Sequence, residues 1–126
     1  MNIPNDRKYS ATHEWVKIEN GKAVVGLTDH AQSEMGDIVF INLPEMGFEI
    51  GAGEAFSDVE SIKAVSDILC PVSGKVTKVN EALLDAPELI NQAPYETFIA
   101  EISDITAEAD GLLTAEQYEK LLGEGA

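Results

Sequence analysis

The chain has 126 residues, 44% of them hydrophobic, which is enough for one globular domain with a buried core but for little more. Its 8 basic and 23 acidic residues give a formal net charge of −15, which argues against binding nucleic acid or an anionic membrane surface, because both repel such a chain. Cys70 is the single cysteine, which excludes an internal disulfide and a thiolate metal cluster, and its apolar neighbours predict a buried thiol.

The first half of the chain is predicted to consist of short strands and one short helix. Residues 13–18 and 22–27 form strand candidates on either side of "ENG", a turn sequence in which Asn and Gly tolerate positive φ. A helix is expected to start at residue 28 or 29 and to stop at Gly36. Residues 37–43 read as a strand that ends at Pro44, because proline cannot donate to a sheet ladder.

The second half continues with strands between turns. Closely spaced glycines from residue 47 lead into a strand of small and apolar residues that ends near Glu60. Further strand candidates are residues 64–69, 74–80 and 97–102. A short helix over 87–91 would have Pro87 at its first position, where proline is favoured. Strands at this spacing predict a mainly β fold, a small sandwich or barrel with peripheral helices.

A C-terminal helix is predicted over 114–122. Thr114 and Gln117 fit a capping box, Leu113 is placed to pack against Tyr118, and Gly123 is a stop signal. A helix this short is not stable alone in water. It should therefore dock on the sheet core through Tyr118 and the neighbouring leucines.

The catalytic patterns considered are missing. Ser10, His13 and Glu14 supply the residue types of a nucleophilic site, but no G-x-S-x-G elbow occurs. The two histidines, at positions 13 and 30, are weak evidence for a metal site, and the phosphate-cradling G-x-x-x-x-G-K-[ST] pattern is absent. The sequence therefore predicts a protein that is not an enzyme and holds no metal.

Lys63 stands out in the stretch "DVESIKAVSDILCPVSG". It is the only formally charged basic residue between Lys22 and Lys75, an interval with nine carboxylates. A turn over Ser61 to Ala64 would place it at a hairpin tip. Lysines are nearly always exposed, so an ordinary surface residue is the simple interpretation. The alternative is a lysine presented for covalent modification, whose amine, protonated at neutral pH, would have to be deprotonated by the modifying enzyme.

Several motifs strongly resemble the glycine cleavage H-protein family over about residues 7–122. They are "KYSATHEWV", "VGLTDHAQ", "GDIVFINLPE", "VESIKAVSD", "PVSGKVTKVNEAL", "PELIN", "PY" and "LLTAEQYEKLL", in family order and at matching spacing. Biotin carriers usually place methionines beside their lysine, and lipoyl domains of the 2-oxo acid dehydrogenases usually place Asp before it. Here the neighbours are Ile62 and Ala64.

The resemblance implies that Lys63 carries lipoic acid in amide linkage, on a hairpin of one barrel-sandwich hybrid domain over 1–126 with a docked C-terminal helix. It implies a monomeric carrier that takes the aminomethyl group of glycine from glycine decarboxylase (P protein) to the tetrahydrofolate-dependent aminomethyltransferase (T protein). Dihydrolipoyl dehydrogenase (L protein) reoxidises such carriers, and a lipoate ligase or octanoyltransferase loads them. The expected location is the cytoplasm, as in bacteria, or the mitochondrial matrix if a transit peptide was removed.

The resemblance also implies site residues. The lipoylating enzyme is expected to recognise Glu60 and Ser61 next to the lysine. Positions matching Thr12, Glu14 and Asp67 line the family's cleft for the loaded arm, where carboxylates suit a cationic amine. His30 is a further candidate for this cleft. Each residue also has a simpler role, such as a solvated strand or turn position.

One segment departs from the family pattern. After "PY" the family usually has a Gly-Trp turn, whereas this chain has "ETFIAEI", one residue shorter, with Phe98 at the position where the aromatic residue is expected. The altered turn at 96–98 indicates either a local repacking in a glycine cleavage carrier or an H-like protein that relays lipoyl groups to other enzymes; the intact lysine motif favours the glycine cleavage role. A third alternative, independent of the turn, is an interaction module that carries no cofactor.

Overall fold

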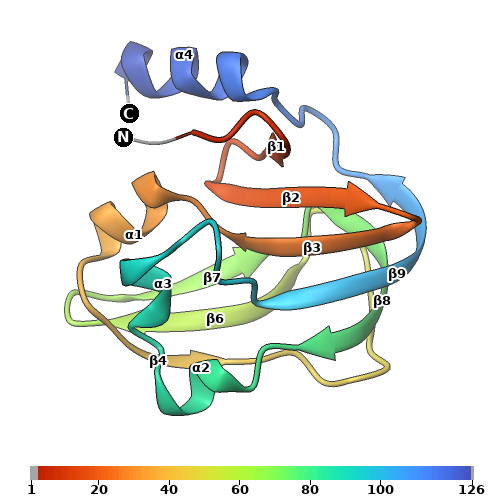
Figure 1. Ribbon diagram of the computed structural model, residues 1–126, viewed down its shortest axis with the longest axis horizontal. Coiled ribbons are helices and arrows are strands. Elements are labelled where there is room, and N and C mark those ends of the chain that lie inside the picture. Colours follow the sequence, from red (N-terminus) through yellow and green to blue (C-terminus); the bar gives the residue numbers. More distant parts are fainter. Residues whose placement is uncertain (1–2, 126) are drawn as a thin grey trace.

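The computed structural model describes residues 3–125, so the ends of the predicted domain, residues 1, 2 and 126, lie outside the described residues. Two antiparallel sheets form the body of the molecule (Figure 1). The larger sheet has the order β1 (Lys8–Tyr9), β2 (Glu14–Glu19), β3 (Lys22–Leu27), β9 (Ala100–Glu108), β8 (Val72–Val79), β5 (Glu49–Ile50). The smaller has the order β4 (Ile38–Asn42), β6 (Ala55–Ser61), β7 (Val65–Leu69). Four helices complete the described fold: α1 (Asp29–Met35), α2 (Ala82–Asp85), α3 (Leu89–Gln92) and α4 (Ala115–Gly125).

The inner faces of the two sheets share one hydrophobic core. Ile41, Val59 and Ile68 of the small sheet belong to the same buried cluster as Val25 and Ile102 of the large sheet. Each of these side chains is at most 1% exposed. Burying such side chains is the main favourable term in folding. The mainly β fold predicted from the strand spacing is confirmed.

Local turn and cap signals predicted the first elements well. Asn20 and Gly21 adopt φ of 53° and 76° between β2 and β3. Thr28 caps α1, its Oγ1 accepting from Ala31 N at 3.1 Å, and Gly36 ends the helix with φ of 75°. One boundary differs: β2 begins at Glu14 instead of residue 13, because His13 has φ of 75°, which is incompatible with an extended strand.

The region before β9 differs more from expectation. The strand predicted over 97–102 starts only at Ala100 and continues to Glu108; Thr97 lies before it, and its hydroxyl donates to Leu89 O at 3.1 Å. Helix α3 begins at Leu89, two residues after the proline proposed for its first position, and Pro87 lies in the preceding turn. Helix α2 and strand β1 were not predicted, and both are too short to leave a periodic pattern.

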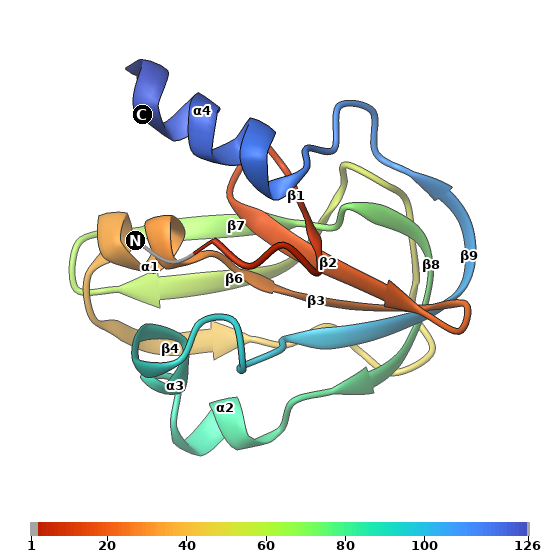
Figure 2. The same ribbon diagram turned by 45° about the horizontal axis from the view of Figure 1, so that its top comes forward.

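The C-terminal helix docks as expected but ends later. Thr114 and Gln117 form the predicted capping box, with bonds of 2.9 and 3.2 Å. Leu113 and Tyr118 pack in a second cluster that also holds Tyr9. The helix continues through Gly123 to Gly125, so the stop predicted at Gly123 is wrong; that glycine does not adopt the positive φ of a left-handed cap. Figure 2 shows α4 beside β1 and the start of β2.

Tyr118 ties α4 to the rest of the molecule. It is fully buried and stacks on Tyr9 with ring centroids 4.7 Å apart. Its hydroxyl is 2.8 Å from both His13 Nδ1 and Thr28 Oγ1, and burial raises its pKa to about 12. The helix is thereby joined to the N-cap of α1.

Removing this hydroxyl should weaken the fold. We expect Tyr118→Phe to lower the free energy of unfolding by about 1–2 kcal/mol, because buried Thr28 and half-buried His13 each lose a hydrogen bond. Urea denaturation measures it. Tyr95→Phe is the matched control: that hydroxyl is half-buried and takes one bond, from Asp29 N at 3.2 Å, so its loss should cost less. Equal losses in the two variants would contradict the assigned role of Tyr118.

Candidate functional site

The hairpin between β6 and β7 presents Lys63 at its tip. Ser61 N donates to Ala64 O at 2.9 Å and closes the turn. The Ser61 hydroxyl oxygen accepts from the backbone N–H groups of Lys63 at 3.2 Å and Ala64 at 3.3 Å. Ser61 therefore shapes the turn that exposes the lysine, in the manner of a serine-stabilised turn. The hairpin predicted from the sequence is confirmed.

The tip of this hairpin rests on the end of α1. In both ribbon views the β6–β7 loop lies at the same end of the molecule as α1 (Figures 1 and 2). Ile62 N donates to Asp37 O at 3.0 Å. A Cβ added at Gly36 would lie 3.6 Å from Lys63 Cε, so the lysine stem runs across this glycine.

Glu14 is a buried carboxylate held by three donors. It is 2% exposed. Ser10 Oγ donates to its Oε1 at 2.6 Å, Thr12 Oγ1 donates to the same oxygen, and Leu69 N of β7 donates to Oε2 at 3.4 Å. Burial raises the pKa of Glu14, and the bonds from Ser10, Thr12 and Leu69 act in the opposite direction. Glu14 therefore links the large sheet to β7, the strand that follows Lys63.

His30 lies near the cluster of Ser10, Thr12 and Glu14 and contacts it through the ring of His13. The His13 and His30 rings have centroids 4.4 Å apart, and His30 Nε2 is 3.8 Å from Glu34 Oε1. Burial lowers the pKa of His13, and the neighbouring His30 lowers it further. The turn that carries Thr12 and Glu14 is thus packed against α1.

The structure leaves Asp67 apart from this cluster. It is exposed on β7, opposite Asp58 of β6 in the ladder. In residues 3–125, no hydrogen bond or ion pair joins Asp67 to Thr12 or Glu14. Glu60 is half-buried at the end of β6. The predicted residues therefore fall into a hairpin group and a cluster around Glu14, which the bond to Leu69 N connects.

Two contributors were missed from the sequence. Besides donating to Oε1, Ser10 Oγ accepts from Glu14 N at 2.9 Å, and Ser10 N donates to Glu14 O at 2.9 Å. His13 makes the turn between Thr12 and Glu14. The spacing of polar residues at 10, 12 and 14 is a signal that could have indicated Ser10. The partnership with Leu69 has no local signal, because 55 positions separate the two residues.

The altered turn at 96–98 is filled by Phe98. Its ring packs in the cluster that holds Tyr9, Trp15 and Tyr118, with Lys78 Nζ 5.6 Å from the ring centroid. Asn80 Nδ2 donates to its carbonyl at 2.8 Å. The shorter turn is therefore accommodated by packing inside the same fold.

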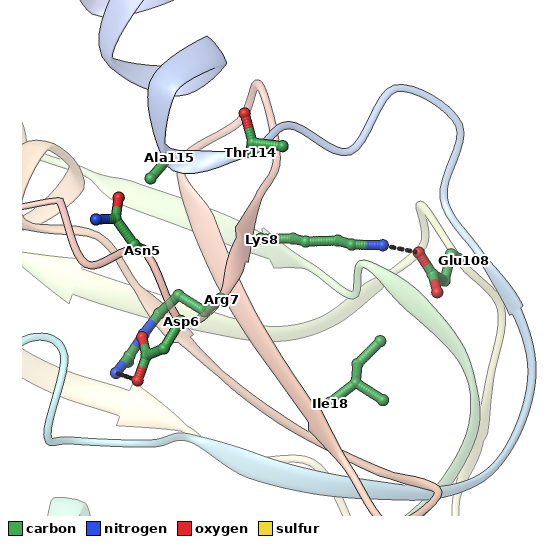
Figure 3. A pocket seen from close by; sticks show the side chains of 8 residues that line it. All are labelled: Asn5, Asp6, Arg7, Lys8, Ile18, Glu108, Thr114 and Ala115. Atoms are coloured by element: carbon green, nitrogen blue, oxygen red, sulfur yellow. Dashed lines mark hydrogen bonds and ion pairs between the residues drawn. The ribbon is translucent and has the colours of Figure 1, made fainter.

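Two other features lie outside the site. Cys70 is buried, as predicted, and burial raises its pKa to about 11. An open cavity of about 530 Å³ lies between the N-terminal strand, β9 and the start of α4 (Figure 3). Its charged groups pair with one another: Arg7 with Asp6 at 2.8 Å, and Lys8 with Glu108 at 3.2 Å.

Fold and site together define a class of protein. A β-sandwich that displays one lysine at an exposed hairpin tip, with short helices around it, is the barrel-sandwich hybrid of the lipoyl carriers. The sequence profile described as Glycine cleavage H-protein matches residues 7–125. The chain belongs to the glycine cleavage H-protein family, the lipoyl carriers of the glycine cleavage system.

Similar proteins support this assignment over the full chain. The glycine cleavage system H protein of Geobacillus sp. (strain WCH70) is 53% identical over 99% of this chain and 100% of its own length. The H protein of Geobacillus thermodenitrificans is 51% identical over the same shares. The crystal structure of an H protein from Mycobacterium marinum has a TM-score of 0.91 and 41% identity, covering 96% of this chain and 99% of that one.

Proposed function

We propose that lipoic acid is attached in amide linkage to Nζ of Lys63. The observation that carries the proposal is the placement of this lysine at an exposed, well-formed turn. In the described part of the chain its Nζ takes part in no ion pair or hydrogen bond, so its amine is accessible for acylation. An amide bond to Nζ would remove the positive charge and leave the hairpin wholly acidic.

The residues around the turn suit recognition by a lipoylating enzyme. Ser61 holds the turn closed, which keeps the backbone of Lys63 in one conformation before the enzyme binds. Glu60, next to it, supplies a carboxylate in the ladder pair closest to the turn. A lipoate ligase or an octanoyltransferase is the partner that this arrangement fits.

The cluster around Glu14 suits a cationic cargo. When bound, the lipoyl group supplies the sulfur that carries the aminomethyl group. Glu14 offers a carboxylate with spare acceptor capacity on Oε2, since its one bond there is 3.4 Å long. In a partly dry setting an ammonium–carboxylate pair contributes more than the 0–1 kcal/mol typical at a surface. We assign Thr12 to orienting this carboxylate. Asp67 and His30, which make no direct bond to Glu14, are proposed to lie around the loaded arm.

The chain then acts as a non-catalytic carrier. P protein supplies the aminomethyl group, T protein removes it, and L protein restores the dithiol. No helix in residues 3–125 is both long and apolar enough to span a membrane. A monomer in the cytoplasm suits repeated transfer between these three partners.

Glycine–bicarbonate exchange tests this function. The lipoylated chain, supplied with P protein, glycine and labelled bicarbonate, should support exchange of the glycine carboxyl carbon, and the unlipoylated chain should not. Lipoic acid free in solution is the control, because it lacks the protein surface that docks on P protein. A lipoylated chain that stays inert with its cognate P protein would instead favour a lipoyl relay role.

A further inference from the structure

Segment 36–38 contacts the turn of the lysine hairpin. The Ile62 N–H reaches the Asp37 carbonyl at 3.0 Å, and the Lys63 stem crosses Gly36. Within the described residues, the Ile62–Asp37 bond is the one hydrogen bond that joins the turn at 62–64 to a segment outside the hairpin. The β4–β6 ladder holds the hairpin as far as Ser61, opposite Ile38, and the bond to the Asp37 carbonyl extends this hold by one residue into the turn.

Asn91 of α3 holds this segment on both sides of Asp37. Its Nδ2 donates to Gly36 O at 2.9 Å, and its Oδ1 accepts from Ile38 N at 2.9 Å. Nδ2 also donates to Gln32 Oε1 of α1 at 3.0 Å. A carbonyl only accepts and an N–H only donates, so the two backbone partners fix the orientation of the amide.

We infer that Asn91 is a positioning residue for the hairpin that carries Lys63. By fixing the two peptides beside Asp37, it holds the Asp37 carbonyl where Ile62 N reaches it and limits the motion of the tip. The inference rests on the proposed function, because a positioned tip matters only if Lys63 is modified.

A positioned tip has a kinetic consequence. An enzyme that must order a mobile loop loses binding free energy to the loss of conformational entropy. Once the loop is bound, the chemistry at Nζ is the same. Loosening the tip should therefore weaken recognition of the unmodified chain and leave the rate of the bound complex unchanged.

Amide hydrogen exchange of Ile62 tests the physical step. Asn91→Ala should speed exchange of the Ile62 N–H about five- to tenfold, because the bonds that hold its acceptor are lost. Asn80→Ala is the matched control: Asn80 is also half-buried and donates to a carbonyl, that of Phe98 at 2.8 Å, on the other side of the fold. Asn80→Ala should leave Ile62 exchange unchanged.

Lipoylation kinetics tests the functional step. With lipoic acid, ATP and a lipoate–protein ligase, Asn91→Ala should raise the KM for the unmodified chain about five- to tenfold and leave kcat unchanged. Asn80→Ala should change neither constant. Asn91→Asp, which keeps the acceptor for Ile38 N and loses the donor to Gly36 O, should lie between the wild-type chain and Asn91→Ala in both measurements.

Several outcomes would overturn the inference. Wild-type exchange of Ile62 in Asn91→Ala would show that the tip is held by other contacts. The same changes in Asn80→Ala would show a general loss of stability instead of a local one. If Asn91→Ala does not fold, Asn91→Asp replaces it: wild-type exchange of Ile62 and a wild-type KM in Asn91→Asp would likewise show that other contacts hold the tip. Failure of lipoylation in the wild-type chain would refute the proposed function, while Ile62 exchange still decides whether Asn91 positions the tip.

Discussion

Replacing Lys63 with arginine should abolish lipoylation of the chain. Arginine keeps the positive charge and the exposed position, but its guanidinium stays protonated and does not form the amide. Intact mass after incubation with lipoic acid, ATP and ligase should show full addition of one lipoyl group to the wild-type chain and none to Lys63→Arg.

Lys75→Arg is the control for this experiment. Lys75 is also exposed, but it lies on β8 in a regular strand pair with β5, so the ligase has no turn to recognise there. This variant should be lipoylated at the wild-type rate. A Lys63→Arg chain that still gains the lipoyl mass would refute the site assignment, whatever the fold of the chain.

Replacing Glu14 with alanine should shorten the lifetime of the aminomethyl-loaded protein. The amine of the cargo would lose its buried carboxylate partner and become more exposed to water. We expect loss of the aminomethyl group to be on the order of tenfold faster, the change produced by about 1.4 kcal/mol. Release of formaldehyde and ammonia from the isolated loaded protein measures this rate.

Glu108→Ala controls for the loss of a carboxylate as such. Glu108 is exposed on the far side, where it pairs with Lys8, and its removal should leave the decay unchanged. Unchanged decay in Glu14→Ala would contradict a role for this carboxylate in holding the cargo.

The pH dependence of stability checks independently that Glu14 is buried. Its pKa is raised in the folded chain, so its contribution to the free energy of unfolding is fully present below the ordinary value of 4.5 and is lost as pH rises through the raised value. As pH rises from 4.5 through the raised pKa of Glu14, the free energy of unfolding of the wild-type chain should therefore fall relative to that of Glu14→Gln. Urea denaturation at a series of pH values measures this difference.

The parts of the fold that were predicted depend on local chemistry. Asn20 and Gly21 take the positive φ that the hairpin needs, and Thr114 caps α4, because each signal involves residues a few positions apart. Two limits were predicted wrongly. Helix α4 continues through Gly123 because that glycine does not adopt the positive φ of a left-handed cap. Strand β9 starts late, and the Thr97 hydroxyl before it bonds to Leu89 O outside the strand, a contact that a strand pattern does not show.

The site divides in the same way. The exposed lysine turn was predictable, since Ser61 and Lys63 lie within one hairpin. The burial of Glu14 was not predictable, because it depends on contact with Leu69 of β7, which lies 55 positions away in the sequence. The sequence indicated Asn91 only as part of the family motif "PELIN" and predicted no role for it. Its two backbone partners lie at the C-terminal end of α1 (Gly36) and in β4 (Ile38), far from it in the sequence.

The three donors to Glu14 affect the entropy change that accompanies binding of a cation by this carboxylate. A free glutamate samples many rotamers and must be immobilised when it meets a cation, which weakens the association. Here Ser10, Thr12 and Leu69 N have already immobilised it during folding. In the proposed function, this carboxylate is therefore already ordered before the aminomethyl group binds, and folding has already opposed that loss of entropy. An ordered carboxylate of this kind would bind an ammonium with little change in its own conformation, and the proposed carrier has to bind and release its aminomethyl group in every cycle.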